Sequence, residues 1–150
     1  MFFFTLRFQI TTFVPLNIPN RHPMIRTLIY IFLGGGIGSV LRYCVQMALS
    51  ERMSPHYFPW ATFTVNLAGS FFIGLFYVLS SRFNLSAEVR LLLTGGLCGG
   101  FTTFSTFCND GLLMLKQGFY VPFLLYTLLS VTIGIAAVFA GGAFGRYLSY

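Results

Sequence analysis

Three long stretches without a charged residue constrain the fold of this chain more than any other feature. No Asp, Glu, Lys or Arg occurs in residues 53–81, 91–109 or 117–145. A helix of about 20 apolar residues crosses about 30 Å of hydrocarbon. A fourth candidate, residues 26–50, is interrupted by Arg42, which is expected near the membrane edge or facing a polar group. The sequence therefore predicts an all-α membrane protein with four transmembrane helices.

The composition agrees with a chain that is mostly surrounded by lipid. Hydrophobic residues make up 56% of the chain and charged residues only 8%, whereas soluble domains carry about 25% charged residues. The net charge of +6 is then expected to come from arginines at helix ends rather than from a nucleic-acid surface. The three cysteines, Cys44, Cys98 and Cys108, have no metal-binding spacing, and we expect them to be small buried hydrophobic residues.

The four predicted helices are joined by short links. We expect helices over residues 25–49, 58–81, 87–116 and 120–148. Short links make neighbouring helices antiparallel. Ser86, with Glu88 close behind it, is typical of a helix start.

The first part of the chain has a different character. Pro15, Pro19 and Pro23 rule out a continuous helix there. We interpret residues 1–23 as an N-terminal extension, with Met24 as the natural start, and residues 24–150 as the four-helix transmembrane domain.

The third predicted helix contains residues that form helices poorly. The pairs Gly95-Gly96 and Gly99-Gly100 precede the hydroxyl-rich stretch FTTFSTF at residues 101–107. One interpretation is that the glycines only permit close helix packing, as we expect for Gly34-x3-Gly38 and Gly141-x3-Gly145. Packing leaves the hydroxyl stretch unexplained. A functional break near the middle of the helix is therefore favoured, in a place where protein or a polar cavity satisfies the backbone.

The polar residues of the charge-free stretches are neutral hydrogen-bond donors. They lie on the second helix around Asn66, in the TTFSTF stretch of the third, and on the fourth at Tyr126 and Ser130, which share one helix face. The acids Glu51, Glu88 and Asp110 are all expected at helix ends. Donors without acids favour a path for a small anion, and the electropositive edges of phenylalanine rings can assist such a path.

Three motifs resemble those of the CrcB/Fluc family of fluoride channels. They are GLCGGFTTFSTF at residues 96–107, GGGIGSVLRY at 34–43 and FPWATFTVNLAGSFFIG at 58–74. Their order and spacing match the family, and the resemblance covers residues 24–148, which places the N-terminal extension outside it. It implies an antiparallel, dual-topology homodimer in the cell membrane. That dimer would lower cytoplasmic fluoride by passive efflux and hold a structural sodium ion at the interface.

The resemblance also implies roles for individual residues of this chain. The residues expected along the fluoride pathway are Asn66, Phe104, Ser105, Phe107, Tyr126 and Ser130. The backbone carbonyls of Gly99 and Thr102 are expected around the sodium ion, and Arg42 is expected to hold the vestibule. Asp110 and Cys108 depart from the pattern, because members of the family more often have Glu and Ser there.

The distribution of polar and basic residues also indicates how the chain assembles. The first helix offers few polar side chains apart from Arg42 and Gln46, so pores at a subunit interface suit the chain better than a pore inside one bundle. Without the N-terminal extension, four arginines lie on the side of the termini and two or three basic residues on the other side. So weak a bias permits insertion in both orientations.

Three other functions are less well supported. A small multidrug exporter of the dual-topology type, the main alternative, needs a membrane-embedded acid in its first helix, and residues 27–50 contain none. A packing subunit of a larger complex does not need the hydroxyl-rich lining. An enzyme is not expected, because no nucleophile, base and orienting group converge, and His22 and His56 lie outside the predicted spans.

Overall fold

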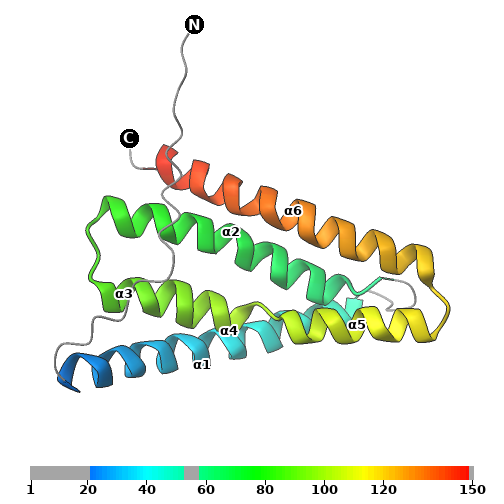
Figure 1. Cartoon of the computed structure of the whole chain (residues 1–150), viewed down its shortest axis with the longest axis horizontal. Helices are drawn as coiled ribbons and strands as arrows, with labels where there is room; N and C mark the ends of the chain where they lie inside the picture. The colour runs from blue at the N-terminus through cyan, green and yellow to red at the C-terminus, as the bar shows by residue number, and fades with distance from the viewer. Residues whose placement is uncertain (1–20, 53–57, 149–150) are drawn as a thin grey trace, which may run out of the picture.

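The computed structural model describes residues 21–52 and 58–148 as an antiparallel arrangement of four long helical rods (Figure 1). The helices, in chain order, are α1 (Arg21–Arg52), α2 (Trp60–Arg82), α3 (Ala87–Leu91), η1 (Leu92–Cys98), α4 (Gly99–Phe101), α5 (Phe104–Lys116) and α6 (Tyr120–Tyr147). The third rod consists of α3, η1, α4 and α5 in succession. Within the described residues, each rod runs antiparallel to the one before it, as the short links predicted.

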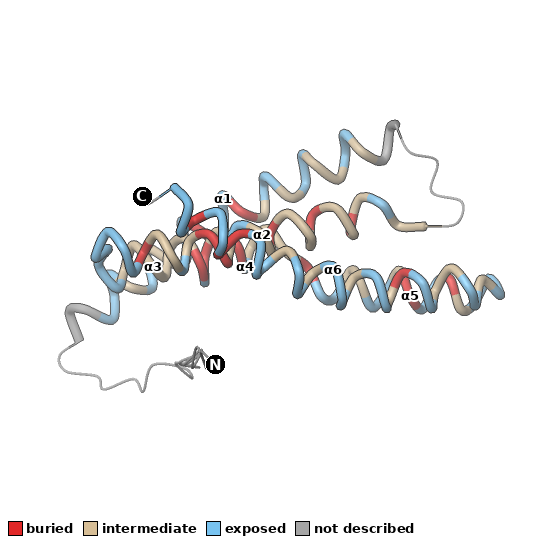
Figure 2. Tube along the Cα trace, turned by 90° about the horizontal axis from the view of Figure 1, so that it is seen from above, coloured by how far each residue is buried: buried red, intermediate tan, exposed pale blue. Residues whose placement is uncertain are grey.

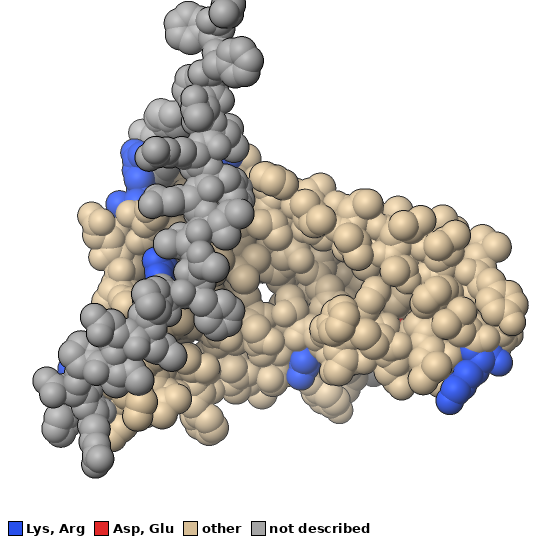
Figure 3. All heavy atoms as spheres, in the orientation of Figure 1, with Lys and Arg blue, Asp and Glu red and all other residues tan. Residues whose placement is uncertain are grey.

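Four helical segments of the described chain are long and apolar enough to cross a membrane. They are Met24–Leu49, Trp60–Arg82, Ala87–Lys116 and Tyr120–Tyr147. Figure 3 shows lysines and arginines gathered mainly toward the two ends of the long axis, with a mostly uncharged band between them. The four predicted spans are thus confirmed.

The helix ends follow local signals that the sequence contains. The side chain of Ser86 accepts a hydrogen bond from the Val89 amide at 3.3 Å and caps α3, as predicted. Gly118 has a φ of +80°, the left-handed conformation that ends α5 and starts the turn into α6.

The first helix begins earlier than expected. It starts at Arg21, so Pro23 lies in its first turn, where a missing amide proton costs nothing. The rest of the predicted extension, residues 1–20, lies outside the described residues, and so does the link at 53–57 that holds His56. The interpretation of Met24 as the natural start stays a prediction.

Glycines set the closest contacts within two helix pairs. In the first pair, α1 packs against η1 and α4. A Cβ on Gly38 would collide with the Leu97 carbonyl oxygen, and one on Gly100 with the Gly35 carbonyl oxygen. In the second, α2 packs along α6, where a Cβ on Gly141 would collide with the Phe71 carbonyl oxygen. Figure 2 shows buried residues mainly where α1, α2 and α4 lie close together.

The third rod is broken, as predicted, but the break lies beyond its glycines. Residues 95–100 stay helical within η1 and α4. Thr102 and Thr103 are extended, with φ/ψ of −78°/158° and −147°/114°. The packing interpretation is therefore right for Gly96 and Gly100, both of which contact α1. The hydroxyl-rich stretch is what breaks the helix.

One expectation about the cysteines is wrong. Cys98 is buried, but Cys44 and Cys108 are exposed. Both lie on helix faces that point away from the rest of the single chain, and in a membrane protein such faces contact lipid or another subunit rather than water.

Replacing a contact glycine should loosen the bundle. Gly38→Ala and Gly141→Ala should each lower the free energy of unfolding by about 1–3 kcal/mol, because an added methyl group would overlap a backbone carbonyl. Thermal unfolding of the detergent-solubilised protein would measure this. Gly36→Ala is the matched control, since no described residue beyond its own turn of helix lies within 4 Å of the place its added methyl group would take. Equal midpoints for all three variants would contradict the packing scheme.

Candidate functional site

Two neighbouring threonines end one helix and start the next. The Thr102 hydroxyl donates back to the Cys98 carbonyl oxygen at 2.9 Å, and the Thr102 amide donates to the same oxygen at 2.9 Å. The Thr103 hydroxyl accepts a hydrogen bond from the Thr106 amide at 3.2 Å and so caps the start of α5. The hydroxyls thus compete with the helical hydrogen bonds and stabilise the break.

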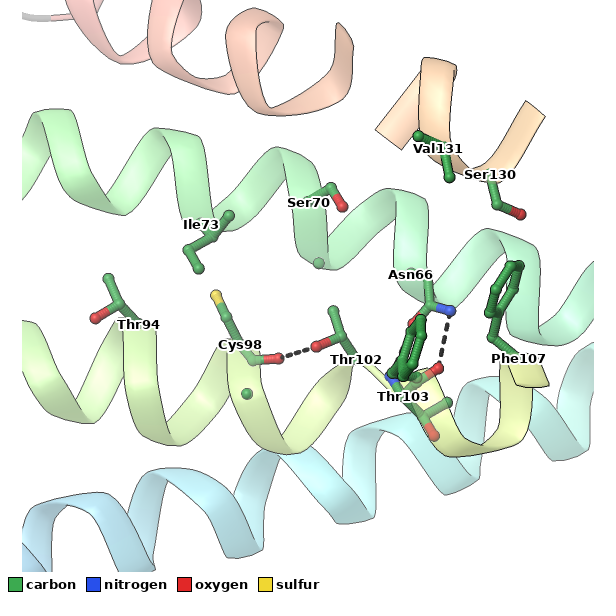
Figure 4. Close-up of a pocket in the computed structure, with 13 residues that line it drawn as sticks. Asn66, Ser70, Ile73, Thr94, Cys98, Thr102, Thr103, Phe107, Ser130 and Val131 are labelled. Atoms are coloured by element: carbon green, nitrogen blue, oxygen red, sulfur yellow. Dashed lines mark hydrogen bonds between the residues drawn. The ribbon is translucent and has the colours of Figure 1, made fainter. Parts of the chain in front are cut away.

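Asn66 on α2 ties this break to the neighbouring helix. The Thr103 amide donates to the Asn66 side-chain oxygen at 2.7 Å, and the Asn66 side-chain nitrogen donates to the Thr103 carbonyl oxygen at 3.1 Å (Figure 4). The single side chain replaces two backbone partners that a continuous helix would have provided. Asn66 is therefore a positioning residue for the break, and one N–H of its amide is not used by Thr103.

Side chains of α1 satisfy two further carbonyls. The Arg42 guanidinium donates to the Thr102 carbonyl oxygen at 3.2 Å, and the Ser39 hydroxyl approaches the Gly100 carbonyl oxygen at 3.4 Å. Arg42 faces a polar group, as predicted. The Gly99 carbonyl has lost its helical partner. In a regular helix it would accept from the Thr103 amide, but that amide donates to Asn66 instead.

A groove of ≈ 350 Å³ lies along the break, walled by α2, the third rod and α6 (Figure 4). None of its lining residues is charged. They are Asn66, Gly69, Ser70, Ile73, Thr94, Cys98, Gly99, Thr102, Thr103, Phe104, Phe107, Ser130 and Val131. Phe104 and Val131 are 77% and 54% exposed, so the groove opens on the side of the bundle. The lining therefore offers neutral hydrogen-bond donors on an otherwise apolar flank.

Aromatic rings continue from the groove into the protein. Phe104 and Phe107 stack with their ring centroids 5.7 Å apart, and Phe107 lies 4.9 Å from the Tyr126 ring. Tyr126 is fully buried and also meets Phe58 edge-on at 5.4 Å. The two predicted phenylalanines therefore lie together, and Phe107 joins the groove to Tyr126.

Two hydroxyls on one face of α6 are buried without a partner. Among the described residues, neither the Tyr126 hydroxyl nor the Ser130 hydroxyl has a hydrogen-bond partner. An unsatisfied buried hydroxyl costs about 1–3 kcal/mol. The Ser130 hydroxyl is thus available to a solute in the groove, whereas the Tyr126 hydroxyl, beyond Phe107, lies beside the carboxyl group of Asp110.

The expectation that all three acids lie at helix ends is wrong for Asp110. Asp110 lies inside α5, one turn after Phe107, and is half-buried beside the hydroxyls of Thr62 and Tyr126. Its Oδ2 atom has no hydrogen-bond partner among the described residues. The three-residue spacing from Phe107 puts Asp110 on the same helix face, which could have revealed this position from the sequence. The groove itself contains no acid.

The remaining predicted residues are placed as follows. Gly99 and Thr102 line the groove, whereas Ser105 is exposed outside it, with its hydroxyl 3.4 Å from the Thr103 hydroxyl. Sequence reasoning did not single out Ser39, which reaches the break from α1, or Thr94, which lines the groove. Neither shows its role in the sequence, because each depends on which helices are neighbours.

Comparison with known proteins places most of the helical region in one family. Residues 29–142 match the family model described as CrcB-like protein, Camphor Resistance (CrcB). The fluoride-specific ion channel FluC of Bacteroides fragilis is 57% identical over 123 residues, which cover 81% of this chain and 97% of that protein. FluC of Phocaeicola vulgatus is 50% identical over 116 residues, covering 77% and 95%. FluC of Allorhizobium ampelinum is 46% identical over 124 residues, covering 82% and 98%.

Removing the Asn66 amide should release the break. In Asn66→Ala the Thr103 amide loses its acceptor, so its hydrogen exchange should become at least about tenfold faster, in line with the 1–3 kcal/mol cost of a buried unsatisfied group. Exchange measured by mass spectrometry on peptides that span residues 99–106 would report this. Ser70→Ala, one turn further along the same groove wall, should leave exchange unchanged. Unaltered exchange in Asn66→Ala would show that the break does not depend on Asn66.

Proposed function

This chain belongs to the CrcB-like protein family, and from that premise we propose that it forms a fluoride-selective channel. It is a multi-pass membrane protein with a bent third span. We propose that it works in the cell membrane, where passive efflux of fluoride lowers the cytoplasmic concentration. The observation that carries the proposal is the uncharged, hydroxyl-rich groove at the helix break.

The groove has the chemistry that a small anion requires. Fluoride holds its water tightly, so a path must offer donors that replace the hydration shell. Asn66, Ser70 and Ser130 supply such donors from the groove wall. The buried Tyr126 hydroxyl lies beyond Phe107, next to the carboxyl group of Asp110. A cation path would instead need carboxylates or rings of carbonyls.

The break adds a favourable backbone field. Because the chain is extended at Thr102 and Thr103, α5 starts in the middle of the third span. The first amides of a helix have no intrahelical acceptor, and the helix dipole makes this end positive. Thr103, Phe104 and Phe107 of this helix start line the groove, so an anion there would lie near the positive end of a 13-residue helix.

The open side of the groove supports a dimer. Polar groups in contact with lipid are costly, yet the groove opens on a flank where Phe104 is 77% exposed. We propose that a second copy of the chain, in the opposite orientation, covers this flank and completes two pores. Phe104 would then lie between the two subunits rather than in lipid.

Sodium fits the backbone groups at the break. Hard cations prefer oxygen ligands, and no cluster of His, Cys, Asp or Glu in the described part of the chain could hold a metal. The Gly99 carbonyl has lost its helical donor, and the Thr102 carbonyl retains one lone pair beside its bond to Arg42. We propose that these two oxygens of each subunit hold a structural sodium ion, which would tie the breaks of both copies together.

Fluoride flux is the direct test of the function. The protein reconstituted in liposomes should release fluoride, measured with an ion-selective electrode, at least about a hundredfold faster than chloride. Only a narrow path dense in donors compensates for fluoride dehydration. Similar rates for both ions would indicate an unselective anion pore and contradict the proposal.

The phenylalanine pair gives a second test with a matched control. Phe107→Ile should slow fluoride flux by about tenfold, equivalent to about 1.4 kcal/mol, because isoleucine keeps the bulk but lacks the electropositive ring edge. Phe72→Ile changes a ring that lines an adjoining apolar pocket and not the groove, and this variant should conduct normally. Normal flux through folded Phe107→Ile would assign this ring to packing alone.

Opposed orientation predicts complementation between biased subunits. Extra lysines in the link after α2, at residues 83–85, should fix one orientation and reduce flux, because Lys and Arg favour the cytoplasmic side. Coexpression with a copy that carries the lysines at residues 53–57 should restore flux. Full activity of the first variant alone, with its C-terminal tag accessible from one side only, would show that the subunits are parallel.

A further inference from the structure

Arg42 places a full positive charge on the oxygen that we propose as a sodium ligand. Its guanidinium donates to the Thr102 carbonyl at 3.2 Å, and the contact is partly buried. Within the described part of the chain, this hydrogen bond goes to a neutral carbonyl rather than to a carboxylate, so the bond leaves the charge of Arg42 uncompensated. The Thr102 carbonyl is also one of the groups freed by the break.

A guanidinium and a sodium ion on one carbonyl oppose each other. Both are attracted to the partial negative charge of the oxygen, and each repels the other. At separations of about 5 Å and an effective dielectric constant of about 20, repulsion between unit charges is well above thermal energy. The Thr102 oxygen therefore binds sodium with reduced affinity while it accepts the hydrogen bond from Arg42.

We propose that Arg42 is a tethered cation that sets the sodium affinity of the helix break. This inference rests on the sodium site in the proposed function and assigns Arg42 a role distinct from anion attraction at a vestibule. Arg42 holds the Thr102 carbonyl in place when sodium is absent, together with the bonds of Asn66 to Thr103. It also weakens sodium binding, because its positive charge repels the ion.

Sodium-dependent thermal stability tests this directly. The purified protein is titrated with sodium chloride against N-methyl-D-glucamine chloride at constant ionic strength, and the unfolding midpoint is recorded. Arg42→Gln keeps a side-chain N–H donor but removes the charge, so half of the sodium-dependent shift should occur at a concentration at least about tenfold lower. Arg42→Lys keeps the charge, so its half-maximal sodium concentration should lie close to that of the unmodified protein.

Two further variants separate this effect from general charge and from misfolding. Arg26→Gln removes a charge from the exposed start of the same helix, about 24 Å from Arg42 at 1.5 Å per residue, and should leave the sodium dependence unchanged. Gln46→Glu keeps Arg42 but adds a carboxylate one turn away on α1. Gln46→Glu should also lower the sodium concentration at which half of the stabilisation occurs. It tests the role of the Arg42 charge if Arg42→Gln does not fold.

The outcomes distinguish this inference from the function it rests on. Sodium affinity that is unchanged or weaker in both Arg42→Gln and Gln46→Glu overturns the inference. A stabilisation that appears in these variants but not in the unmodified protein supports it. If sodium stabilises none of the proteins, the sodium site and the role of Arg42 both fall, while fluoride flux through the unmodified protein still decides the channel function.

Discussion

The broken third rod depends on hydrogen bonds that other helices supply to its freed backbone. In a membrane no water replaces a lost helical hydrogen bond, and each unsatisfied group costs several kcal/mol. Asn66 satisfies both the amide and the carbonyl of Thr103, and Arg42 satisfies the carbonyl of Thr102. Without these partners, the extended pair at residues 102–103 would be less stable than a continuous helix.

These bonds require helices that approach closely, and the glycines permit that approach. Gly34 and Gly38 on α1 meet the backbone of η1 and α4 with no room for a side chain. The same contact brings Ser39 and Arg42 to the carbonyls of Gly100 and Thr102. Packing and polar satisfaction are thus two consequences of one arrangement.

The break in turn creates the chemistry of the groove. It places the positive start of α5 within a membrane span, beside neutral donors from α2 and α6. It also leaves an open polar flank, with Phe104 largely exposed. A single chain with such a flank is poorly suited to lipid, which is why the proposed channel is a dimer whose subunits complete each other.

The sequence by itself determined the four spans, the cap at Ser86 and the existence of a break, because each follows from composition or from interactions within a few residues. It also grouped Phe104, Phe107 and Asn66 correctly in one region. Only the tertiary structure decided that Asn66 pairs with Thr103, that Arg42 bonds the Thr102 carbonyl, and that Asp110 lies inside beside Tyr126. The physical reason is the distance along the chain over which each interaction acts. The helix period fixes which residues share a face, but a long polar side chain meets its partner only when separate helices have packed.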